Sequence, residues 1–163
     1  MNLPRVDFVL EVSRNHLDST SSRNTEIDSI LAAYACSVIY AALERRIVVV
    51  IAERAGAHAP ADASVRSFAR VSARRLTRSI LVGELSGLAG HFGEQCKDDF
   101  RRGCEENAVA SWDAIIRNRH GVAHEGESGA EQVPLSSLTF ADVEMQYGEC
   151  LLILEAFEEA LAL

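Results

Sequence analysis

The sequence predicts an all-α fold, a bundle of roughly four to six helices. Apolar residues recur at spacings of three and four over most of the chain, which is the period of an amphipathic helix. No segment shows clean alternation of apolar and polar residues joined by turn dipeptides. With 163 residues and 48% hydrophobic content, the chain can fill one core, so we expect a single domain over 1–163.

The first half of the chain is expected to hold two helices. Pro4 suits a first helical turn, and apolar residues recur from Val6 to Leu17, so residues 4–18 should form a short helix that the polar run 19–24 ends. Thr25 is a candidate N-cap for the longest helix, which should run to Gly56. The β-branched block IVVVI at 47–51 is also compatible with a strand, but helical periodicity precedes it without a breaker.

A basic helix is expected from Ala63 to Ile80, with an inward face of Val65, Phe68, Val71, Ala73 and Leu76. The glycines at 83, 87, 90 and 93 indicate a broken or closely packed helical segment. Helical patterns return at 94–100 and at 105–119, and we expect Gly121 to end the second of these helices. A Thr139 cap should then open a last helix.

The inward residues expected in the last two helices follow from the same periodicity. They are Val109, Trp112, Ile115 and Ile116 in the first, and Val143, Tyr147, Leu151, Leu154 and Phe157 in the second.

Charge is distributed unevenly along the chain. The net charge of -8 argues against a protein that coats nucleic acid indiscriminately, because that mode requires many cations. The basic helix nevertheless contains a stripe of arginines at successive i,i+4 positions, namely Arg66, Arg70, Arg74 and Arg78. Such a stripe is typical of a solvated face or of an ion-pairing partner for an acidic helix, and it is also compatible with RNA binding.

The compartment is expected to be the cytoplasm. The longest apolar stretch, IVVVIA at 47–52, is too short to span a bilayer, and the N-terminus lacks a basic segment followed by an apolar one. We therefore expect a soluble protein without membrane association. The cysteines at 36, 96, 104 and 150 form no CxxC pair and are expected to be reduced thiols, with a Cys96–Cys104 disulfide as the alternative.

The segment IIRNRHGVAHEG at 115–126 is the strongest candidate site, and three interpretations fit it. Cations in the last turn of a helix interact favourably with its dipole. His120 and His124 have the spacing of a zinc-binding pair, although the HExxH pattern fails at Gly121 and the third ligand is open among His91, Glu125 and a cysteine. In the third interpretation, RNA cleavage, Arg119 holds a phosphate and His124 moves protons.

RNA cleavage places two demands on this segment. Five positions along a straight helix separate Arg119 and His124 by roughly 140°, so a shared site requires the helix to end or distort at Gly121. One histidine also cannot readily serve as base and acid on opposite sides of one phosphorus. A two-fold dimer would bring two arginines and two histidines to one cleft, so we expect a homodimer, and we expect no cofactor.

The residues RHGVAHEG at 119–126 resemble the signature of the HEPN superfamily. The segment AAYACSVIYAALERRI at 32–47 is similar to the long helix of the RiboL-PSP type of HEPN domain, and the order of helices also fits. The resemblance implies a helical bundle that dimerises around the motif and acts as a metal-independent endoribonuclease. It further implies a place in a prokaryotic toxin-antitoxin, abortive infection or other defence system, with an antitoxin or a neighbouring defence protein as a partner.

Carried over by position, the resemblance makes Arg119 the phosphate-binding arginine, His120 the polar residue after it, and His124 the acid-base histidine. His120 stands where asparagine is more common, and Arg117-Asn118 offers a competing frame with six residues before His124, so the choice between the two arginines stays open. Glu44 is a candidate for orienting the motif arginine, with an intrahelical ion pair as the alternative.

Two other classes of function are compatible with the same residues. HEPN-like domains also act as non-catalytic RNA- or nucleotide-binding and scaffolding modules, and the acidity of the chain is compatible with such a role. A structural or antitoxin-bound partner protein is the third class.

Overall fold

The computed structural model describes residues 3–19, 25–58, 63–77, 80–124 and 138–162, with the side chains of 25, 58 and 120–124 excepted. Within these ranges the chain forms seven α-helices and no strand, which confirms the all-α class. The helices are α1 (Pro4–Ser19), α2 (Thr25–His58), α3 (Ala63–Leu76), α4 (Val82–Gly90), α5 (Glu94–Gly103), α6 (Glu106–His124) and α7 (Phe140–Leu161).

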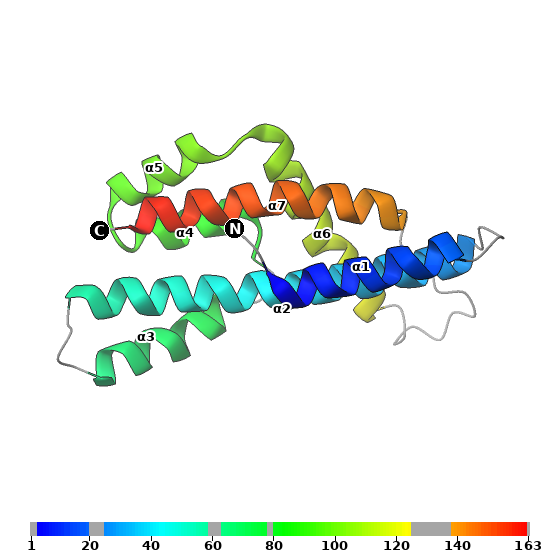
Figure 1. Ribbon diagram of the computed structural model, residues 1–163. Coiled ribbons are helices and arrows are strands. Elements are labelled where there is room, and N and C mark those ends of the chain that lie inside the picture. Colours follow the sequence, from blue (N-terminus) through cyan, green and yellow to red (C-terminus); the bar gives the residue numbers. More distant parts are fainter. Residues whose placement is uncertain (1–2, 20–24, 59–62, 78–79, 125–137, 163) are drawn as a thin grey trace.

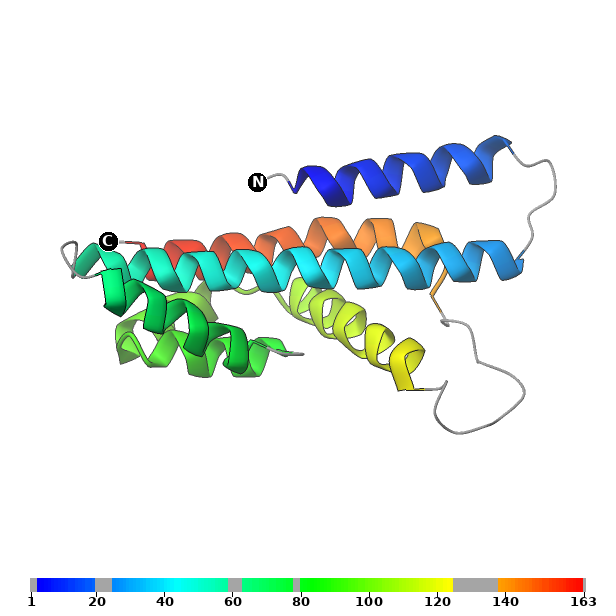
Figure 2. The same cartoon turned by 90° about the horizontal axis from the view of Figure 1, so that it is seen from below.

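Helix α2 is the spine of the bundle. It is 34 residues long, and α7 lies beside it and runs in the same direction (Figures 1 and 2). Helix α1 covers the first half of α2, whereas α3 folds back along its second half. The α4–α5 pair packs near the C-terminal half of α7, and α6 crosses the α2–α7 pair obliquely (Figure 2).

A single hydrophobic cluster draws residues from all seven helices. Its largest fully buried side chains include Trp112, Phe100 and Phe157. The rings of Phe100 and Phe157 meet edge to face, with centroids 5.6 Å apart and planes at 89°, a favoured arrangement for aromatic pairs. The inward residues expected on α6 and α7 are buried or partly buried, as the periodicity predicted.

The β-branched block of α2 is helical, as its context predicted. Ile47 is fully buried and Ile51 is 5% exposed, so this stretch contributes to the core from within a long helix. The described residues form seven helices rather than the four to six expected, because the glycine-rich segment forms a helix of its own. Gly93 has φ of 130°, a backbone conformation that glycine adopts at little cost, and it separates α4 from α5.

The predicted inward face of α3 is wrong. Helix α3 ends at Leu76 rather than Ile80, and of the five residues expected inside only Ala73 is buried, whereas Phe68 is 73% exposed. The helix packs on α2 through the face of Ala69 and Ala73, whose small side chains permit a close approach. Large apolar residues on α3 therefore remain on the outer surface.

The predicted interruption at Gly121 is also wrong, because α6 continues through Gly121 to His124. A glycine within a helix costs about 1 kcal/mol relative to alanine, which weakens the helix without ending it.

The N-terminus of α7 carries the expected Thr139 cap. The Thr139 hydroxyl accepts a hydrogen bond from the backbone N–H of Asp142 at 3.2 Å, and the Asp142 carboxylate accepts one from the backbone N–H of Thr139 at 2.9 Å. These bonds satisfy donors that a helix N-terminus leaves unpaired. The hydrogen bond from the Thr139 hydroxyl to the Asp142 carboxylate, together with the one from the Thr139 backbone N–H, lowers the pKa of Asp142.

All four cysteines are free thiols, so the alternative disulfide between Cys96 and Cys104 is absent. Cys36 and Cys150 are fully buried, and burial raises the pKa of the Cys36 thiol to about 12. None of the helices in the described part of the chain combines the length and apolarity needed to cross a bilayer.

Candidate functional site

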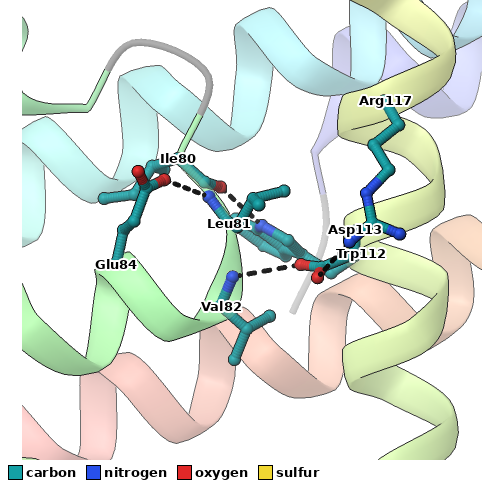
Figure 3. A network of polar contacts seen from close by, with 7 residues as sticks. All are labelled: Ile80, Leu81, Val82, Glu84, Trp112, Asp113 and Arg117. Carbon is teal, nitrogen blue, oxygen red and sulfur yellow. Dashed lines mark hydrogen bonds and ion pairs between the residues drawn. The ribbon is translucent and has the colours of Figure 1, made fainter.

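Helix α6, which carries the motif, is anchored to the connection between α3 and α4 (Figure 3). The indole Nε1 of Trp112 donates a hydrogen bond to the carbonyl of Ile80 at 2.9 Å, and this contact is buried. The next residue, Asp113, accepts a hydrogen bond through Oδ1 from the backbone N–H of Val82 at 3.1 Å. Both bonds fix the body of α6 against the start of α4.

Arg117, the alternative motif arginine, lies on the outer side of α6. Its Nη2 atom is 3.4 Å from Asp113 Oδ2, and the Arg117 side chain is 71% exposed (Figure 3). An ion pair this exposed contributes little to stability and constrains the side chain weakly. The Arg117 guanidinium is therefore accessible to a ligand.

Arg119, the arginine carried over from the HEPN motif, lies against the bundle. Its guanidinium carbon Cζ is 4.4 Å from the centroid of the Tyr40 ring, and Tyr40 is a buried residue of α2. This is a cation–π contact, which is stronger when it is shielded from water. Asn118, between the two arginines, donates a hydrogen bond from Nδ2 to the carbonyl of Ala114 at 2.9 Å.

Because α6 is continuous, helical periodicity relates its motif positions. Arg119 and position 124 are separated by roughly 140° around the axis, whereas Arg117 and position 124 differ by roughly 20°. Position 120 falls on the same side as these last two. The register thus favours Arg117 over Arg119 as the arginine that shares a side of the helix with position 124. The side chains of His120 and His124 lie outside the described residues.

Glu44 lies one turn after Tyr40 on α2, and it lines an open groove of about 670 Å³ between α2 and α3. The groove also contains Arg45, Arg70 and Arg74. Within the described part of the chain Glu44 makes no ion pair, so the intrahelical pair weighed as an alternative does not form there. Its role in orienting a motif arginine stays a prediction.

Of the predicted arginine stripe of α3, only two described members line the same groove. Arg70 and Arg74 line the groove, but Arg66 lies against α2 at Gly56, where an added Cβ would come within 2.5 Å of its Cδ atom. Arg78 lies outside the described residues. None of the other three forms an ion pair with a described residue, so the acidic-helix partner considered for the stripe is absent there.

Two contributors to this region were not predicted from the sequence. Tyr40 contacts Arg119, and Arg45 lines the groove with arginines of α3, but the sequence pattern indicates neither grouping. The i,i+4 spacing of Tyr40 and Glu44 on a long helix is a signal that places them on one side, but only the packing of α2 against α3 and α6 reveals their neighbours.

The two histidines of the predicted zinc-binding pair, His120 and His124, have side chains outside the described residues. Among them, no group of three or more His, Cys, Asp or Glu residues has the arrangement of a metal site.

Comparisons with protein-family models, with curated proteins and with solved structures found no match to this chain.

Proposed function

We propose that this protein is a metal-independent endoribonuclease of the HEPN type, with a composite active site formed by two copies of α6 in a homodimer. The observation that carries the proposal is the motif RHGVAHEG in an all-α chain, preceded by a second arginine at position 117. Support comes from the continuous helix, which brings Arg117 and position 124 to one side of α6.

The proposed reaction is an attack of a ribose 2′-hydroxyl on the adjacent phosphodiester. A base accepts the hydroxyl proton, the bond between O2′ and phosphorus forms, and the bond between phosphorus and O5′ breaks as an acid protonates O5′. The products end in a 2′,3′-cyclic phosphate and a 5′-hydroxyl. A guanidinium stabilises the negative charge that develops on the phosphoryl oxygens.

His124 is proposed as the acid-base residue, with one histidine from each copy acting on opposite sides of the phosphorus. Two arginines are candidates for the phosphate. Arg119 has the spacing of the family motif, whereas Arg117 has the exposure and the register, and we propose Arg117 as the phosphate-binding residue and Arg119 as the residue that fixes α6 to α2. A toxin-antitoxin or defence role, with an antitoxin as partner, is the biological setting that the resemblance suggests.

The proposal is tested by incubating the full-length protein with labelled single-stranded RNA and transfer RNA in the presence of a chelator. We expect cleavage by the parent protein and a loss of roughly a hundredfold or more in rate for His124→Ala. The matched control is His91→Ala, which removes an exposed histidine at the end of α4. Equal rates for the parent and His124→Ala, or no cleavage by a folded dimer, would count against the proposal.

A non-catalytic RNA- or nucleotide-binding module is the second candidate, and the groove between α2 and α3 favours it. Three arginines line this groove, so a local basic surface exists on an acidic protein. Binding of RNA without any product, unchanged in His124→Ala and Arg117→Ala, would support this module in place of the nuclease.

A further inference from the structure

The groove between α2 and α3 has an unusual balance of charge. Among the described residues that line it, Arg45 comes from α2, Arg70 and Arg74 come from α3, and Glu44 is the one acidic residue. None of these four side chains forms an ion pair with a described residue. The guanidiniums therefore face the groove with one carboxylate among three positive charges, and an anionic ligand would relieve their mutual repulsion.

The remaining lining of the groove is apolar. Ala41, Val48 and Val49 contribute to its wall on α2. A volume of about 670 Å³ lies within the range of sites that bind small molecules and cofactors. The groove thus offers an apolar surface for a sugar or a base beside cations that match phosphate.

Glu44 indicates which phosphate-bearing ligand fits. A carboxylate repels phosphate, so its presence disfavours inorganic phosphate or a polyphosphate as the sole occupant. It accepts hydrogen bonds only, and ribose hydroxyls are donors that lie next to the phosphate in a nucleotide. Carboxylates bind ribose hydroxyls in this way in dinucleotide-binding folds, and the 2′-hydroxyl distinguishes RNA from DNA.

We propose that the α2–α3 groove is a ribonucleoside-phosphate site, in which Arg45, Arg70 and Arg74 bind phosphate and Glu44 accepts a hydrogen bond from the ribose 2′-hydroxyl. The ligand is a segment of single-stranded RNA. This choice rests on the proposed function, in which RNA is the substrate.

The test measures the Kd of the full-length chain for a fluorescent single-stranded oligoribonucleotide, with all variants made in a His124→Ala background so that the probe stays intact. Arg70→Ala combined with Arg74→Ala should raise Kd roughly tenfold or more and reduce the slope of log K against log salt by about 0.7 per arginine. The matched control is Arg75→Ala, an exposed neighbour on α3 that does not line the groove. A change no larger than that of the control would overturn the site.

Glu44→Ala tests the ribose contact separately, because it removes the acceptor, whereas glutamine would keep an accepting carbonyl oxygen. The parent chain should bind RNA more tightly than DNA of the same sequence, and Glu44→Ala should remove most of that preference. Glu159→Ala, on the exposed side of α7, is the control and should retain the preference. An unchanged RNA-to-DNA ratio in Glu44→Ala would overturn the role of Glu44.

Further results distinguish free nucleotide from RNA as the ligand, and the groove proposal from the nuclease proposal. A free ribonucleoside monophosphate that binds as tightly as the oligomer would overturn the choice of RNA. Groove variants that bind normally in a chain whose parent cleaves RNA would refute this inference and leave the nuclease standing. If the parent never cleaves RNA but its RNA binding depends on the groove arginines, the nuclease proposal would be refuted and the groove site would stand.

Discussion

The guanidinium of Arg119 lies over the ring of Tyr40, with Cζ 4.4 Å from the ring centroid. This contact joins the motif helix α6 to the long helix α2, and it engages one of the two arginines of the motif segment with the bundle. Arg117, two residues earlier, forms an exposed ion pair with Asp113. The two arginines therefore have different surroundings, and we expect them to have different roles.

Alanine substitutions should separate these roles. Arg117→Ala should reduce RNA cleavage roughly a hundredfold, as removal of a transition-state donor does, and change the free energy of unfolding by less than about 0.5 kcal/mol. Arg119→Ala should reduce the free energy of unfolding by about 1 to 2 kcal/mol through loss of the cation–π contact. The measurements are a cleavage rate and a urea titration for each variant. If Arg119→Ala kept its stability but lost most of its RNA cleavage rate, while Arg117→Ala remained active, Arg119 would be the phosphate-binding residue.

The cap of α7 should be detectable in stability. Thr139→Ala removes the hydroxyl that accepts from the Asp142 N–H, so it should lower the free energy of unfolding by about 1 kcal/mol. The Asp142 pKa is lowered in the folded state, so the contribution of this carboxylate is present above its unfolded pKa and is lost as pH falls. Urea titrations at neutral and acidic pH measure both effects. A Thr139→Ala protein as stable as the parent at neutral pH would contradict the cap.

Tyr147 gives a pH dependence at the alkaline end. Its hydroxyl donates to Asp7 Oδ1 at 3.0 Å, and burial, together with this bond and the Asp7 charge, raises the pKa of Tyr147 above its usual value. The contribution is present below the unfolded pKa near 10 and is lost as pH rises above it. Tyr147→Phe should lose about 1 kcal/mol at neutral pH and show a shallower decline in stability above pH 10. Tyr34→Phe, at a site 53% exposed, is the control, and parallel declines in Tyr147→Phe and the parent would contradict the assignment.

Two helical glycines should respond oppositely to alanine. At Gly87 an added Cβ has no heavy atom within 4 Å, so Gly87→Ala should raise the free energy of unfolding by about 0.5 to 1 kcal/mol. At Gly103 an added Cβ would lie 3.0 Å from Cβ of Ala156 on α7, which is closer than normal packing allows. The gain in helix stability at Gly103 should therefore be offset by the cost of moving α5 away from α7. Thermal and urea unfolding of both variants test this. Equal stabilisation by both substitutions would mean that α5 and α7 pack more loosely than the structure indicates.

Much of the fold follows from local patterns in the sequence. Thr139 starts α7 because its hydroxyl and Asp142 pair reciprocally, and Trp112 is buried as the period of α6 predicts. The pattern fails at α3, where Phe68 has the spacing of a core residue but is exposed to solvent. The side of α3 that packs closely on α2 is the one that contains the small residue Ala73. It also fails at Gly121, where the glycine lowers helix stability without ending α6.

The candidate site depends more on tertiary contacts. The motif residues were identifiable from the sequence because they adjoin one another, and helical register then relates Arg117 to position 124. The contact of Arg119 with Tyr40 and the grouping of Arg45 with Arg70 join residues that are distant in sequence. Periodicity within one helix carries no information about such partners, so only the assembled bundle reveals them.

The most direct test of the central claim is the chemistry of the RNA ends produced by the purified protein in the presence of a chelator. We predict products with 2′,3′-cyclic phosphate and 5′-hydroxyl ends from the parent, and a rate lower by roughly a hundredfold or more for His124→Ala at equal dimer concentration. Products with 3′-hydroxyl ends, or the same rate for both proteins, would contradict the account.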